Sequence, residues 1–160
     1  MVFQVWRPVV LVAIFLTLIL VVLSIFIHYE MLRMISNAMP AMVGSPRRRL
    51  LSAIGVVFVA HILEISLFAF GFSLMQHRWG LGEISGAIEG GWVDFFYFSA
   101  ASYTTLGMGD IFPTGHLRFV SSIESLTGLV LIGWSASFTY LVMTRFWGMH
   151  GGTGDENGKK

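Results

Sequence analysis

The sequence predicts an all-α membrane protein with three transmembrane helices and one shorter helix that enters the membrane and returns as a loop. Hydrophobic residues make up 55% of the 160 residues and charged residues only 12%. Soluble domains carry about twice that share of charge. The mean hydropathy is +0.74, and the apolar residues form long blocks, as in helices that cross a bilayer. A cytosolic enzyme is therefore not expected.

The charge balance argues against a nucleic-acid partner, and the absence of cysteine excludes thiol chemistry. The formal net charge is +1 and the chain contains no cysteine. We expect no nucleic-acid partner, because electrostatic binding to nucleic acid needs a strongly basic surface. Disulfides and thiolate metal sites are excluded. No HExxH or GxSxG motif occurs, so we predict neither enzymatic activity nor a cofactor.

The first transmembrane helix is predicted within residues 1–30. The stretch from Val9 to Ile27 carries no charge, and Pro8 precedes it where a first helical turn tolerates proline. A secretory signal peptide has a shorter apolar core than this segment. It also ends in a small-x-small cleavage site, and this segment has none. We therefore interpret it as a span that is retained.

A polar cytoplasmic loop is expected over residues 31–49, because two prolines and a glycine interrupt any continuous helix there. It contains most of the arginines near the membrane, namely Arg33, Arg47, Arg48 and Arg49. Basic loops remain in the cytoplasm, which places the N-terminus outside and the C-terminus inside. The three consecutive arginines are also expected to attract anionic lipid.

The rest of the chain, residues 50–147, is predicted to form a second unit. Its middle stretch is apolar but about twelve residues long, too short to cross a bilayer of about 30 Å at 1.5 Å per residue. A glycine-rich polar tail follows this unit and has nothing to pack. The predicted segments are, in order, an outer helix (50–76), a half-length helix (92–103), a returning loop (104–110), an inner helix (118–147) and a disordered cytoplasmic tail (148–160).

The returning loop reads TTLGMGD. Non-helical backbone at membrane depth occurs only where it is buried in protein or lines a water-filled path. Gly107 and Gly109 permit a positive φ at alternate residues, which lets successive carbonyl oxygens point to one side. Such a ladder of oxygens replaces the hydration shell of a cation. The negative C-terminal end of the preceding helix favours a cation at the same place.

This region closely resembles the pore of the potassium channel family, whose filter motif is TVGYG. The resemblance extends from about Trp92 to Arg145 and implies a homotetramer around one selectivity filter, with potassium as the only bound ion. The chain also resembles small bacterial channels with one extra N-terminal span, which implies the bacterial inner membrane. The residues that match the filter are Thr105, Leu106, Gly107, Met108 and Gly109, and the first four are expected to bind potassium.

The resemblance also implies roles for residues around the filter. Thr104, Asp110 and Tyr97 are expected to support it, and Tyr97 either bonds Asp110 or is one of several packing aromatics. Gly128 and Gly133 are candidates for a hinge or for close helix packing. The residues expected to line the cavity below the filter are Leu129, Ile132, Ala136 and Tyr140.

Two departures from the family motif affect selectivity. Met108 replaces the usual tyrosine and Leu106 the usual valine. A thioether bonds weakly, so the phenolic hydrogen bond that braces the filter is lost. A weakly selective cation channel is therefore the alternative. A non-conducting membrane subunit is a third possibility, against which the intact Thr105, Gly107 and Gly109 argue.

Polar residues inside the predicted spans form the last candidate site. His61 and Glu64 lie three residues apart and so share one face of the outer helix. Polar groups within a span find partners in the protein interior, and we expect Glu124 of the inner helix to be the third member of this cluster. A metal site would need more ligands. The cluster is either structural or, through protonation of Glu124, a gate.

Overall fold

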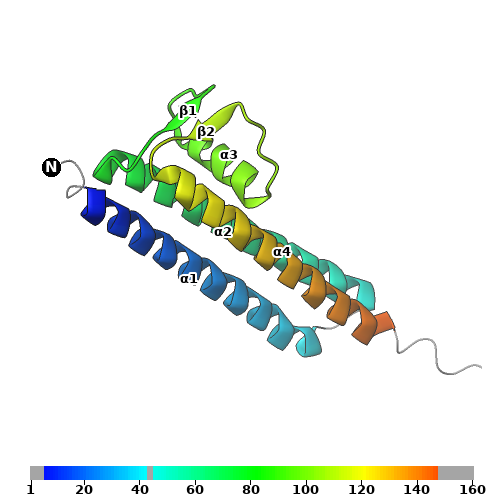
Figure 1. Cartoon of the computed structure of the whole chain (residues 1–160). Coiled ribbons are helices and arrows are strands. Elements are labelled where there is room, and N and C mark those ends of the chain that lie inside the picture. The colour runs from blue at the N-terminus through cyan, green and yellow to red at the C-terminus, as the bar shows by residue number, and fades with distance from the viewer. Residues whose placement is uncertain (1–5, 43–44, 148–160) are drawn as a thin grey trace, which may run out of the picture.

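Figure 1 shows the computed structural model of the chain, which describes residues 6–42 and 45–147. Three long helices lie side by side, with a shorter helix and two strands at one end of the bundle. This confirms the predicted fold class, whereas the tail predicted at 148–160 lies outside the described residues. The elements are α1 (Trp6–Ala38), η1 (Met39–Ala41), α2 (Pro46–Trp79), β1 (Ile84–Gly86), α3 (Trp92–Tyr103), β2 (Ile111–Pro113) and α4 (Leu117–Trp147).

The three long helices α1, α2 and α4 are long and apolar enough to cross a membrane. The chain is therefore an integral membrane protein. The N-terminal end of α1 lies at the same end of the bundle as α3 and the strands, and the C-terminal end of α4 lies at the opposite end (Figure 1). The connection between α1 and α2 also lies at that opposite end.

The helix boundaries differ from the predicted ones around residues 31–49. Helix α1 continues to Ala38 and α2 begins at Pro46, so most of the predicted loop is helical. Arg33 donates to Glu30 at 3.0 Å, one turn earlier on the same helix, and such pairs support a polar helical turn. The N–H group of the first helical residue has no partner within the helix, so a proline there loses no hydrogen bond. Pro46 therefore begins a helix instead of breaking one.

One face of α1 is buried against α2 and α4. Its buried residues recur every three or four positions, the spacing of one helical face. Between its apolar members this face carries Thr17, Ser24 and His28, and all three are at most 1% exposed. From Val10 to Tyr29 the other faces of α1 carry exposed apolar side chains, as expected for contact with lipid.

A small sheet joins the two connections that flank α3. Strands β1 and β2 are antiparallel, with Ser85 opposite Phe112. Gly86 permits this pairing, because a Cβ atom there would lie 2.1 Å from the carbonyl oxygen of Asp110. The sequence did not predict these strands. They hold the segment before α3 beside the segment after the returning loop.

Candidate functional site

The half-length helix α3 is fixed at its start by Asp94. Its Oδ2 atom accepts hydrogen bonds from the backbone N–H groups of Glu89, Gly90 and Gly91 at 3.1, 2.7 and 3.0 Å. A carboxylate at a helix N-terminus is also stabilised by the helix dipole. Asp94 therefore fixes where α3 begins, so that its other end and the loop that follows point toward the middle of the bundle.

The returning loop has positive φ angles at alternate residues. Thr105, Gly107 and Gly109 have φ angles of 58°, 55° and 85°. The positive φ expected at the two glycines is thus confirmed, and Thr105 adds a third alternate position that the sequence did not indicate. A residue with a side chain rarely adopts this conformation, so Thr105 is held there by its surroundings.

Hydrogen bonds to the end of α3 hold the loop in place. The N–H of Thr105 donates to Ser102 O at 3.0 Å, and the N–H groups of Leu106 and Gly107 donate to Ala101 O at 2.9 and 3.2 Å. In a trans peptide the C=O of the preceding residue points opposite to the N–H. The carbonyl oxygens before these three N–H groups therefore point away from α3.

Tyr97 and Asp110 connect α3 to the far end of the loop. The Tyr97 hydroxyl donates to Asp110 Oδ2 at 2.9 Å, and Asp110 Oδ1 accepts from the Ile111 N–H at 3.0 Å. The hydrogen bond to the Asp110 carboxylate raises the pKa of the Tyr97 hydroxyl. Thr104, the third residue expected to support the filter, bonds Ala100 O at 2.7 Å within its own helical turn.

Gly128 of α4 lies directly against the end of α3. A Cβ atom at Gly128 would be 2.2 Å from the carbonyl oxygen of Tyr103 and 2.9 Å from its Cγ atom. Around Gly133, by contrast, no described atom lies within 4 Å of a Cβ position. Gly128 is therefore a close-packing position, while a hinge role for either glycine stays a prediction.

Glu124 of α4 is buried against α3. Ser99 Oγ lies 2.5 Å from Glu124 Oε1 and 2.8 Å from the backbone oxygen of Ile65 in α2. A hydroxyl has one proton and a backbone carbonyl only accepts. Both contacts are therefore full hydrogen bonds when Glu124 carries a proton of its own. A neutral carboxyl also fits full burial, because an unpaired charge there is very costly.

Replacing Glu124 by glutamine is expected to leave the stability nearly unchanged, because the amide can donate to Ser99 as the carboxyl does. Glu124→Ala removes that partner and is expected to cost about 1–3 kcal/mol of unfolding free energy. Thermal unfolding of the purified protein in detergent measures both effects. Equal stability of the two variants would contradict this account.

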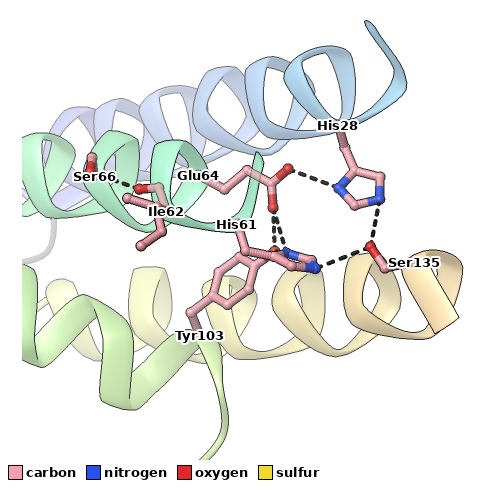
Figure 2. Close-up of polar contacts among 7 residues, drawn as sticks. All are labelled: His28, His61, Ile62, Glu64, Ser66, Tyr103 and Ser135. Carbon is pink, nitrogen blue, oxygen red and sulfur yellow. Dashed lines mark hydrogen bonds and ion pairs between the residues drawn. The ribbon is translucent and has the colours of Figure 1, made fainter. Parts of the chain in front are cut away.

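A second buried cluster joins α1, α2, α3 and α4 (Figure 2). Glu64 Oε1 lies 2.9 Å from His28 Nδ1, and Glu64 Oε2 lies 3.1 Å from His61 Nδ1. Tyr103 donates its hydroxyl proton to Glu64 Oε2, and its oxygen is 2.9 Å from His61 Nδ1. Ser135 Oγ lies 3.2 Å from Nε2 of His28 and 3.1 Å from Nε2 of His61.

The structure corrects the expected membership of this cluster. His61 and Glu64 are in contact as their spacing indicates, but the hydrogen bond that Glu124 makes goes to Ser99. His28 takes the place that the sequence assigned to Glu124. The signal that would have identified His28 is its position on the face with Ser24 and Thr17, which lie four and eleven residues before it.

The stripe of α4 expected to line a cavity is exposed in the single chain. Leu129, Ile132 and Tyr140 are 59%, 39% and 60% exposed, and Ala136 is exposed as well. The other side of α4 is buried against the neighbouring helices. An apolar stripe of this kind is free to face an axis or a neighbouring subunit.

A half-length helix, a returning loop with alternating φ and two flanking spans together define the pore unit of a membrane channel. The sequence model of the ion channel family, a two-transmembrane pore family, matches residues 58–145, more than half of the chain. The chain belongs to this family, which is a family of channels and not of enzymes. Helix α1 precedes the match. Neither the comparison with curated proteins nor the one with solved structures finds a match.

Proposed function

We propose that the chain assembles as a homotetramer and conducts cations, with potassium favoured, through a filter formed by its returning loop. The observation that carries this proposal is the alternation of positive φ at Thr105, Gly107 and Gly109. Carbonyl oxygens aligned in this way replace the hydration shell of an ion. One chain supplies one loop, so a closed ring needs several copies.

In this proposal potassium is bound by carbonyl oxygens of Thr105, Leu106, Gly107 and Met108. The hydrogen bonds of the loop to α3 support it, because they turn the carbonyls of the first part of the loop away from the protein. The side chains of Leu106 and Met108 are 65% and 61% exposed in a single chain. Apolar side chains with this exposure beside a filter are expected to contact neighbouring subunits.

The exposed stripe of α4 would then line the cavity on the inner side of the filter. Gly133, with free space around it, is the better hinge candidate of the two glycines, because Gly128 is needed for packing. Both proposals require α4 to face the axis of the assembly.

The proposed orientation places α3 at the outer side of a bacterial inner membrane. Arg47 and Arg48 are exposed at the start of α2, at the end of the bundle opposite α3. Basic residues favour the cytoplasmic side, and there they can contact anionic lipid headgroups.

Reversal potentials in planar bilayers test this function. The purified protein is placed between potassium on one side and sodium on the other. A reversal potential far from zero, with the sign set by potassium leaving its compartment, supports the proposal. Reversal near zero supports the second candidate, a weakly selective cation channel. Met108 at the position of the family's usual tyrosine favours this candidate. Absence of current in correctly assembled protein contradicts both.

Met108→Tyr is expected to increase the preference for potassium over sodium without a change in fold. A phenolic hydroxyl can donate to a group behind the filter, whereas the thioether bonds weakly. The reversal potential under mixed potassium and sodium measures the change. Leu106→Val alters only side-chain bulk and serves as the control. An unchanged reversal potential in Met108→Tyr would show that the bracing hydroxyl is not what limits selectivity.

A further inference from the structure

The cluster around Glu64 brings four potential metal ligands together inside the helix bundle (Figure 2). One ligand atom each from His28, His61 and Glu64 lie within 4.8 Å of one another. The Tyr103 oxygen lies 2.9 Å from His61 Nδ1 and bonds the same carboxylate. These residues come from three separate elements, α1, α2 and α3, so only the folded chain assembles them.

One protonation pattern of the cluster leaves two histidine lone pairs free to bind a cation. Ser135 has one hydroxyl proton, so it can donate to Nε2 of only one of the two histidines, although it can accept from both. When both Nε2 atoms carry a proton, both hydrogen bonds to Ser135 are satisfied. The Nδ1 lone pairs of His28 and His61 then face the Glu64 carboxylate. Electron pairs facing a carboxylate repel unless a cation lies between them.

A divalent metal ion fits this pattern of lone pairs and protons. Metal-bound histidines carry their proton on the other ring nitrogen and donate it to an outer acceptor, and Ser135 is placed to accept both. Imidazole nitrogens and carboxylate oxygens are ligands typical of zinc, and the Tyr103 oxygen is a fourth donor beside them.

The spacing of the ligands is also close to what such an ion needs. At metal–ligand distances of about 2.0–2.1 Å, tetrahedral ligands are roughly 3.3 Å apart. The Nδ1 to carboxylate distances here are 2.9 and 3.1 Å. These two pairs need to separate by only a few tenths of an ångström, and the ligand atoms of His28, His61 and Glu64 all lie within 4.8 Å of one another.

We propose that His28, His61, Glu64 and Tyr103 form a binding site for a divalent transition metal of the zinc type, oriented by Ser135. His28 and Glu64 are fully buried, while the side chain of His61 is 17% exposed, so the ion enters past His61. The site ties α1 to the pore unit. Because Tyr103 is the last residue of α3 before the returning loop, the bound ion also anchors the base of that loop.

The test is metal binding to the full chain purified in detergent with a tag that contains no histidine. Cobalt is the probe, because its visible spectrum reports four-coordinate nitrogen and oxygen ligands, and zinc is then added to displace it. We expect one cobalt ion per chain by elemental analysis and a rise in unfolding temperature on loading. His28→Gln should abolish both signals, and His61→Gln should do the same.

Two further variants keep the test decisive. Ser135→Ala retains all four ligands and is expected to weaken the affinity about 10- to 100-fold, as loss of an outer hydrogen-bond partner does. His77→Gln is the matched control, because His77 lies on α2 outside the cluster and bonds Ser73 O of its own helix at 2.8 Å. It should bind cobalt as the unmodified protein does.

Two results would overturn the proposal. One is an unmodified chain that takes up no stoichiometric cobalt, which would mean that hydrogen bonds alone hold the cluster together. The other is equal binding by His28→Gln, Ser135→Ala and His77→Gln. Because every readout is metal binding or thermal unfolding, the outcome is independent of whether the chain conducts potassium.

Discussion

Gly107→Val is expected to abolish cation flux. The φ angle of Gly107 is 55°, a region that a β-branched residue adopts only at a cost of about 1–3 kcal/mol. No described atom lies within 4 Å of a Cβ position there, so the substitution is opposed by backbone conformation and not by lack of space. In a ring of identical loops the strain arises in every subunit, and the carbonyls leave their common direction.

Flux of potassium into proteoliposomes measures this effect. Gly80→Val is a matched control, because Gly80 has the same φ of 55° and equally open surroundings but lies at the C-terminal end of α2. It should lose similar stability and still conduct. Wild-type flux through Gly107→Val, or loss of flux in both variants, would contradict the assignment of this loop as the filter.

Gly128→Ala is expected to cause the largest structural defect of any single methyl addition to α4. The new Cβ would lie 2.2 Å from the carbonyl oxygen of Tyr103, a backbone atom that no side-chain rotation can remove. Either α4 or the end of α3 must shift. Overpacking of this kind costs about 1–3 kcal/mol or more, and the shift acts on the residue that precedes the filter loop.

The fraction of assembled protein in detergent and its unfolding temperature measure the defect. Gly133→Ala adds the same methyl group to the same helix at a position with free space, and we expect nearly normal assembly. If the two variants behave alike, the close approach of α4 to α3 is not important for assembly.

The spans and the half-length helix could be predicted because hydropathy and length are properties of single segments. The apolar segment 92–103 is too short to cross a bilayer, so it can only enter the membrane partway. The strands could not be predicted. Each of β1 and β2 has three residues, too few to show the alternation that marks a strand, and they form only because the fold brings two distant connections together.

Contacts between helices were predicted less well, and Glu124 shows why. The sequence indicated correctly that Glu124 faces the protein interior. His61, however, contacts Ser135, which lies on the same face of α4 but eleven residues later, or about 16 Å further along the helix axis. Periodicity defines the face of a helix, whereas the depth at which two helices meet depends on loops and packing.

The buried polar face of α1 also determines the order in which the chain can be assembled during synthesis. His28 bonds Glu64, which is 36 residues later in the chain, and Ser135, which is 107 residues later. At about 5–20 residues per second, the ribosome needs roughly 5 to 20 seconds to reach Ser135. The imidazole in the first span is paired by Glu64 well before that time. We therefore expect the pair α1–α2 to pack first in the membrane and to offer the surface on which the rest of the chain packs as it emerges.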